Sequence, residues 1–195
     1  ITMADLEEAS EKVQMGPEKK SKVVPEDEKK MVAYHEVGHG IVGYIIGGGD
    51  RVHKITMIPR GQAGGYTLSL PEEEKSFHSK KYMLDRIARY FGGRAAEEII
   101  FGKENITDGA GSDIYYATLI AKDIVTKYGM TEKFGPVFLE ATEEDYMLQR
   151  KYYSEQTGKE VDDEIRKIIT EQYSRAKNIL LDNRDKLEEV TNILL

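Results

Sequence analysis

Apolar residues recur at intervals of three and four along most of this chain, and this spacing constrains the fold more than any other feature of the sequence. Such spacing lines one face of a helix with apolar side chains. The predicted helices cover residues 2–13, 25–46, 79–101, 112–128 and 161–181. Strand-like alternation marks residues 51–59 and 65–70, with a turn at 60–64 between them. The predicted fold class is therefore mainly α with a small β-sheet.

Local signals mark where these elements begin and end. Thr2 and Asp5 resemble an N-terminal capping pair, and Gly16-Pro17 ends the first helix. Pro25 suits the first position of the next helix, which Gly47-Gly48-Gly49 ends. These signals predict two separate helices with a connection between them.

The connection divides the chain into two unequal parts. Residues 18–24 are basic and irregular, so residues 1–24 are predicted to be the end of an upstream domain plus a linker. The main domain is predicted over residues 25–195. Asp182-Asn183 breaks its long last helix, and a further helix is expected to be cut short at Leu195. The chain begins with Ile1 and is expected to be a piece of a longer protein.

Several glycines lie inside the helical patterns. Gly38, Gly40 and Gly43 each cost a helix about 0.5–1 kcal/mol relative to alanine, so we expect another backbone to pack closely there. Residues 79–101 are predicted to stay one helix despite Gly92-Gly93.

The segment after this helix carries the next predicted features. Residues 102–112 are predicted to be a glycine-bearing loop, and Ser112 or Asp113 is expected to cap the helix that follows. The residues expected to point inward from that helix are Ile114, Ala117, Ala121, Ile124, Val125 and Tyr128. Residues 133–140 are a candidate for one more short strand.

Composition removes several classes of function. The chain has 195 residues, no cysteine and a formal net charge of -7, so disulfides and thiolate metal sites are excluded and nucleic-acid binding is disfavoured. No apolar run approaches the roughly 18 residues of a membrane span, and no secretory signal is visible, so no membrane contact is expected from this stretch of chain.

The segment His35-Glu36-Val37-Gly38-His39 has the pattern H-E-x-x-H inside a predicted helix. Residues four apart lie on one face of a helix, so both imidazoles can reach one zinc ion. Glu36 lies about 100° around the axis, where it can act as the general base for a water molecule instead of binding the metal. The pattern predicts a zinc-dependent hydrolase.

A catalytic zinc site normally has a third protein ligand. A third histidine six residues after His39 is absent, because that position is Ile45. His53 and His78 are more easily explained as surface or strand residues. Two carboxylates remain, Asp113 and Glu97, and the pattern alone does not choose between them.

Longer segments resemble one known family. The resemblance rests on residues 18–21 and 33–39, the run from Arg60 to Thr67, the run from Gly92 to Glu98, and the runs 112–114 and 125–130. In this order they resemble the protease domain of the FtsH family of membrane-anchored, ATP-dependent zinc proteases. Val37 and Gly40 stand where the family usually has alanine, and Ser112 stands where it often has asparagine, but no chemical group of the site is lost.

The resemblance implies a helical zincin-like metalloprotease domain that holds one Zn²⁺ per subunit. It implies that Asp113 is the third ligand and that Glu97 is a supporting carboxylate. It also implies a homohexamer that degrades unfolded, damaged or membrane proteins on the cytoplasmic side of the bacterial inner membrane. ATP is expected only in an upstream ATPase module, because this chain has no G-x-x-x-x-G-K-[ST] loop.

The second predicted strand is a candidate for substrate binding. An exposed strand edge can pair with an extended peptide without reading its side chains. Gly65, Tyr66, Thr67 and Leu68 are the residues proposed for this role.

Two alternative functions remain open at this point. One is a zinc hydrolase of a small substrate, which would use the same activation of water. The other is a non-catalytic helical assembly domain that carries an unused motif.

Overall fold

The computed structural model describes residues 2–17, 24–58, 64–71, 76–141, 147 and 153–195. Nearly all of the predicted linker and most of the predicted turn at 60–64 lie outside these ranges. The helices are α1 (Met3–Met15), α2 (Glu26–Ile46), α3 (Lys80–Tyr90), α4 (Gly92–Phe101), α5 (Gly111–Lys122), α7 (Glu155–Asp182) and α8 (Arg184–Leu194). The strands are β1 (Asp50–Thr56) and β2 (Tyr66–Pro71). The prediction of a mainly α fold with a small sheet is confirmed.

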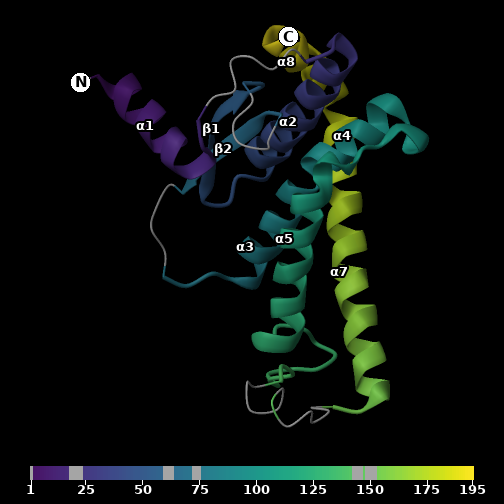
Figure 1. Cartoon of the computed structure of the whole chain (residues 1–195). Helices are drawn as coiled ribbons and strands as arrows, with labels where there is room; N and C mark the ends of the chain where they lie inside the picture. Colours follow the sequence, from purple (N-terminus) through teal and green to yellow (C-terminus); the bar gives the residue numbers. More distant parts are fainter. Residues whose placement is uncertain (1, 18–23, 59–63, 72–75, 142–146, 148–152) are drawn as a thin grey trace.

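The central helix is α2, which contacts α4, α8 and both strands (Figure 1). Gly38 lies against α4 so closely that a Cβ there would stand 2.4 Å from the Gly92 carbonyl oxygen. The expectation of a close backbone is confirmed at this glycine. Gly40 and Gly43 instead accommodate the side chains of Ile55 and Val52, which lie on β1. The small residues of α2 therefore bring both α4 and the hairpin close to the helix.

The two predicted strands are present, and they pair as an antiparallel hairpin. Ile55 is opposite Thr67, and Thr56 is opposite Tyr66. The register is irregular between Val52 and Lys54. Within the described residues the sheet has two strands only, so one edge of β2 carries no further strand.

The prediction of one helix over residues 79–101 is wrong. The chain forms two helices, α3 and α4, which meet at Phe91. The side chain of Ser79 caps the first of them. Gly92 lies at the junction, where a Cβ would stand 2.7 Å from the His39 Cα. Two adjacent glycines weaken the helix at the place where α4 must turn to cross α2.

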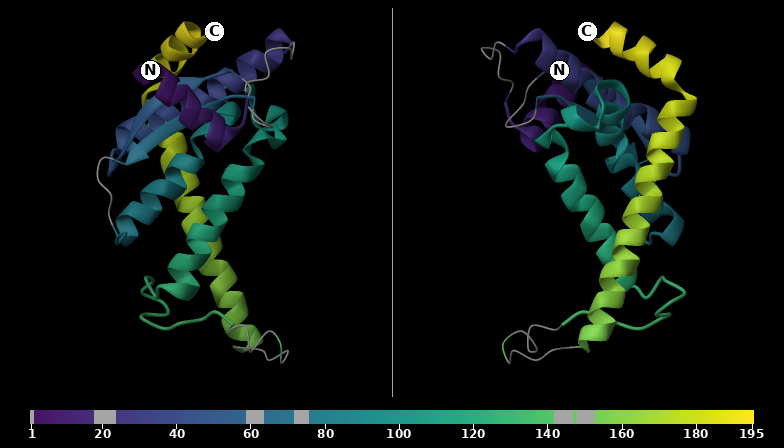
Figure 2. Two further views of the ribbon diagram at one scale, coloured as in Figure 1. Left: turned by 60° about the vertical axis from the view of Figure 1, so that its left-hand side comes forward. Right: turned by 90° about the vertical axis from the view of Figure 1, so that its right-hand side faces the viewer.

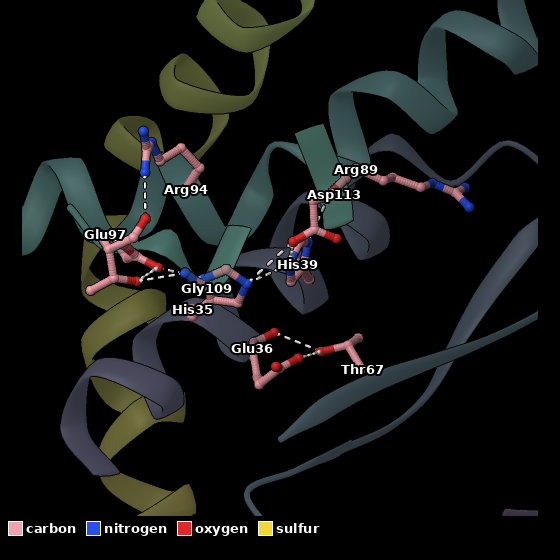
Figure 3. Close-up of polar contacts among 10 residues, drawn as sticks. His35, Glu36, His39, Thr67, Arg89, Arg94, Glu97, Gly109 and Asp113 are labelled. Atoms are coloured by element: carbon pink, nitrogen blue, oxygen red, sulfur yellow. Dashed lines mark hydrogen bonds and ion pairs between the residues drawn. The ribbon is translucent and has the colours of Figure 1, made fainter. Parts of the chain in front are cut away.

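The expected cap at Ser112 or Asp113 is also wrong. A 3-10 turn over Asp108–Ala110 leads into α5, whose N-cap position is Ala110. Asp113 lies in the first turn of α5, and its side chain points away from the helix end toward α2 (Figure 3). Of the residues expected to point inward, Ile114 and Tyr128 are exposed, whereas Ala117, Ala121, Ile124 and Val125 are buried.

The candidate strand over residues 133–140 does not form. The chain there is a turn followed by irregular backbone. A π-helical turn over Asp123–Lys127 ends the helix before it, and the Leu139 N–H donates to the Thr126 carbonyl at 2.6 Å. This hydrogen bond joins the irregular segment to the π-helical turn, not to the sheet.

The long helix α7 runs beside α5 and α3, and the chain then turns at Asn183 so that α8 packs against α2 (Figures 1 and 2). The break predicted at Asp182-Asn183 is confirmed. The main core lies where these helices meet and includes Val37, Ile87, Ile124, Leu180 and Leu187. None of the helices in the described ranges is long and apolar enough to cross a lipid bilayer.

Helix α1 lies at the periphery (Figure 1). Thr2 and Asp5 form a capping box at its start, as predicted, and Gly16 ends it. The side chains of Met3, Leu6 and Val13 are exposed. The division of the chain near residue 24 remains a prediction.

Candidate metal centre

Three side chains from two helices converge at one point (Figure 3). His35 and His39 lie one turn apart on α2, and Asp113 reaches them from the first turn of α5. The two histidine Nε2 atoms are 3.1 Å apart, and each lies 3.4 Å from Asp113 Oδ2. The fold therefore brings together residues that are separated by more than seventy positions in the sequence.

The spacing of these three atoms suits one zinc ion. Zinc binds imidazole nitrogens and carboxylate oxygens at about 2.0–2.2 Å in tetrahedral geometry, so its ligand atoms lie roughly 3.3–3.5 Å from one another. Two of the three separations, 3.4 Å each, fall in this range, and the third, 3.1 Å between the two Nε2 atoms, is slightly shorter. Two histidines and one carboxylate are also a donor set found in catalytic zinc sites.

Hydrogen bonds at the Nδ1 atoms of both histidines orient the rings so that their Nε2 lone pairs face the candidate zinc position. His39 Nδ1 lies 2.9 Å from the Arg89 carbonyl oxygen, which can only accept, so Nδ1 carries the proton. His35 Nδ1 lies 2.6 Å from Glu97 Oε1. In the neutral rings both Nε2 atoms are then acceptors, and they face a third acceptor on Asp113. Three acceptors at this distance repel one another unless positive charge lies between them.

The pKa shifts of His35 and Asp113 also indicate that positive charge is favoured between these side chains. Burial lowers the pKa of His35, but hydrogen bonds with Asp113 and Glu97 and the charge of Glu36 outweigh burial and raise this pKa to about 9. Burial raises the pKa of Asp113, but hydrogen bonds with both histidines outweigh it and bring this pKa to about 2. A proton on His35 supplies the missing charge, and a metal ion can take its place.

Glu97 lies behind His35, on the side of the ring away from Asp113. Its side chain is 1% exposed and receives hydrogen bonds from the Thr107 backbone N–H at 2.7 Å and from the Thr107 hydroxyl at 3.2 Å. Burial raises the pKa of Glu97, but the hydrogen bonds with His35 and Thr107 outweigh it and lower this pKa. The side chain is therefore an ionised acceptor fixed against the imidazole, the arrangement by which a carboxylate orients a metal-binding histidine.

Glu36 is on the same helix, and its carboxylate points toward β2 (Figure 3). The Thr67 hydroxyl lies 2.9 Å from Glu36 Oε2. Both residues line a cavity of about 760 Å³ that also contains His35, His39 and Asp113. The predicted base and the three candidate ligands thus share one cavity.

The predicted substrate segment lines the same cavity. Gly65, Tyr66, Thr67 and Leu68 all contribute to its wall. The other two histidines do not approach the centre. His53 is exposed on β1, and His78 is exposed with its ring stacked on Tyr82 at 4.5 Å between centroids.

Sequence reasoning missed three groups that support this centre. The Arg89 carbonyl left no signal, because a backbone oxygen is present at every residue. Thr107 left none either, since its partner Glu97 is ten residues away across an irregular segment. Thr67 was predicted to belong to the strand that binds substrate, but its contact with Glu36 was not predicted, although the expected alternation of the strand could have placed its side chain toward α2.

Comparison with known proteins identifies the family of this chain. The sequence model of peptidase family M41 matches residues 22–195. ATP-dependent zinc metalloprotease FtsH 3 of Petrotoga mobilis is 48% identical over an aligned stretch of 201 residues, gaps included, that covers 100% of this chain and 31% of that protein. ATP-dependent zinc metalloprotease FtsH of Bacillus subtilis is 46% identical over an aligned stretch of 201 residues, which again covers 100% of this chain and 31% of that protein.

A third relative, ATP-dependent zinc metalloprotease FtsH of Caldicellulosiruptor bescii, is 48% identical over 200 residues, with 100% of this chain and 32% of that protein covered. The chain thus spans about a third of the length of the curated relatives it matches. The family match covers most of the chain and includes every residue of the centre. The chain belongs to peptidase family M41.

Proposed function

We propose that this chain is the zinc-dependent endopeptidase domain of an ATP-driven, membrane-anchored protease. The observation that carries the proposal is the convergence of His35 Nε2, His39 Nε2 and Asp113 Oδ2 within one cavity. The names of the relatives, ATP-dependent zinc metalloproteases, support both the metal and the dependence on ATP.

His35, His39 and Asp113 would hold the ion, with Glu97 and the Arg89 carbonyl orienting the two imidazoles. Zinc, when bound, supplies Lewis acidity, which polarises a carbonyl group and makes water more acidic. The ligands come from packed helices, and Ala33 and Val37, which lie two residues before and two residues after His35 on α2, are fully buried. The site is therefore held rigidly.

Glu36 is proposed as the general base. Its carboxylate takes a proton from water as the water oxygen attacks the peptide carbonyl carbon. It then gives that proton to the amine nitrogen as the C–N bond breaks, and Glu36 returns to its ionised form. The position of Glu36, on the ligand helix but facing β2, allows it to contact the reacting water without binding the metal.

The edge of β2 is proposed to hold the substrate. Residues 65–68 line the cavity, and one edge of β2 has no neighbouring strand in the described part of the chain. An extended peptide that pairs with this edge would pass beside the metal centre. Because backbone pairing reads few side chains, we propose unfolded or membrane proteins as the substrates.

The arrangement of the whole protein is proposed from its relatives and the family resemblance. Residues 1–24 would be the end of an ATPase module plus a linker, and residues 25–195 the protease domain. The whole protein would form a homohexamer at the cytoplasmic side of the bacterial inner membrane.

Replacement of the base tests the function directly. In Glu36→Gln the three candidate ligands stay in place while the base is lost, so zinc content should be unchanged and cleavage of an unfolded peptide should fall by at least about a hundredfold. The matched variant is His35→Ala, which should lose zinc as well. Full activity of Glu36→Gln would remove the assigned base, and turnover of small esters without peptide cleavage would favour a small-substrate hydrolase.

A further inference from the structure

Thr67 makes a contact with Glu36 that the function described so far does not use. Its hydroxyl lies 2.9 Å from the carboxylate Oε2 and 2.8 Å from the carbonyl oxygen of the same residue. Among the described residues, no other side chain has a hydrogen bond to this carboxylate. Both acceptors belong to Glu36, so the single hydroxyl hydrogen is shared between the carboxylate and the helix backbone.

The fold fixes this contact from two sides. Thr67 is opposite Ile55 in the hairpin, and the side chain of Ile55 lies on Gly40 of α2, so the same face of the sheet is turned toward the helix. Gly65, two residues before Thr67, lies so close that a Cβ there would stand 2.6 Å from the Thr56 carbonyl and 3.1 Å from Glu36 Cγ. The start of β2 therefore has little freedom to move away from Glu36.

The contact between Thr67 and Glu36 can assist a general base by fixing the orientation of its carboxylate. A carboxylate has two oxygens, and a free side chain can present either of them in several rotamers. A donor on Oε2 holds that oxygen and leaves Oε1 as the acceptor for the proton of water. When Oε1 has passed its proton to the amine nitrogen, the carboxylate is again ionised and again accepts from the hydroxyl.

We propose that Thr67 is a positioning residue that orients the Glu36 carboxylate for proton transfer. This inference rests on the proposed function, because it assigns an orienting group to the proposed base. It also connects the two halves of the site, because the strand proposed to hold the peptide carries the hydroxyl that aligns the base.

The tests are Thr67→Val, which removes the hydroxyl and keeps a β-branched shape, and Thr67→Ser, which keeps the hydroxyl. For the zinc-loaded protein and an unfolded peptide, Thr67→Val should lower kcat at least about tenfold, since a hydrogen bond to a charged group is lost. KM should stay within about twofold, and zinc content should not change. Thr67→Ser should restore most of kcat.

The control is Thr170→Val. Thr170 is exposed on α7, and its hydroxyl donates to the Arg166 carbonyl within the same helix at 2.8 Å. The Thr170→Val variant makes the same chemical change far from the cavity, so it should leave kcat unchanged. Thermal unfolding of every variant checks the fold, and Thr67→Ala serves as the variant without the hydroxyl if Thr67→Val does not fold.

A structural measurement tests the role of Thr67 without an activity assay. In crystal structures of the zinc-loaded variants, the Glu36 carboxylate should keep its position in Thr67→Ser and turn to another rotamer in Thr67→Val. An unmoved carboxylate in Thr67→Val, or an equal loss of kcat in both variants, would overturn the inference. Loss of kcat/KM through KM alone would also overturn it and would assign Thr67 to peptide binding. An inactive wild-type protein would contradict the proposed function instead, and the crystal comparison would still test Thr67.

Discussion

The imidazole of His35 lies directly on the backbone of Gly93. A Cβ at this position would stand 2.4 Å from His35 Nε2, the atom that faces His39 and Asp113. The glycine pair at the junction of α3 and α4 therefore serves the metal centre as well as the packing of α4 on α2.

Gly93→Ala is expected to displace the His35 ring. Because the methyl group would stand only 2.4 Å from Nε2, zinc affinity should fall at least about tenfold, in the range seen when groups that orient metal ligands are lost. Gly111→Ala is the matched control, since a Cβ there meets nothing within 4 Å. Competition titration with a zinc chelator measures the zinc affinity of both variants. Equal affinities for the two variants would show that the ring does not depend on Gly93.

Asp113 and Glu97 are expected to respond differently to removal of their charge. Asp113→Asn loses a candidate ligand, so stoichiometric zinc should be lost at micromolar chelator concentrations. Glu97→Gln keeps an amide oxygen that can accept but removes the negative charge next to His35 Nδ1, so zinc affinity should fall by about 10–100-fold and binding should remain stoichiometric at high zinc. Elemental analysis after dialysis measures the difference. The opposite order of effects would make Glu97 the third ligand.

Zinc binding to the metal-free protein is expected to strengthen as pH rises. The pKa of His35 is raised from its ordinary 6.5 to about 9, so at pH 7 this ring carries a proton that zinc must displace. One proton released per zinc gives an apparent affinity that rises about tenfold per pH unit between pH 7 and about pH 9. Asp113 contributes nothing there, because its pKa is about 2 and it is already ionised.

The raised pKa of His35 also determines how the stability of the metal-free protein changes with pH. A folded-state pKa above the unfolded value stabilises the metal-free protein fully below about pH 6.5, and this contribution is lost as pH rises through about 9. Metal-free protein should therefore become less stable over the interval in which zinc binds more tightly. Isothermal titration at pH 7, 8 and 9, with unfolding curves at the same values, checks both trends. A zinc affinity that does not change with pH would contradict the assignment of the proton to His35.

Peptide binding along β2 is tested by a proline scan of Gly64 to Leu68. A proline removes the backbone N–H, so at least one position should lose cleavage of an unfolded peptide while zinc content is retained. Variants that lose zinc or unfold report on the hairpin and not on the substrate. Unchanged cleavage at every position that keeps zinc would assign the peptide to another wall of the cavity.

The sequence predicted the elements whose signals are local. Helical spacing and the glycines at 47–49 located α2, and alternation located the hairpin, because both patterns reflect burial on one face. H-E-x-x-H placed two imidazoles together because residues four apart on a helix share a face. The distance between these two rings could therefore be anticipated.

The errors occurred where tertiary packing determined the outcome. The break at Phe91 depends on how α4 crosses α2. The spacing of apolar residues within α3 and α4 carries no information about that crossing. Asp113 has the residue type and position of a helix cap, and only the approach of α5 to α2 turns its side chain to the histidines. The choice between Asp113 and Glu97 could not be made from spacing, since the two carboxylates lie on opposite sides of one imidazole.

The most direct measurement is a crystal structure of the zinc-soaked protein with anomalous data collected on both sides of the zinc absorption edge. We expect one zinc peak per chain, located between His35 Nε2, His39 Nε2 and Asp113 Oδ2, and no such peak in His35→Ala. A chain that takes up no zinc, or that binds it at another place, would contradict the assignment of these three residues as the zinc ligands.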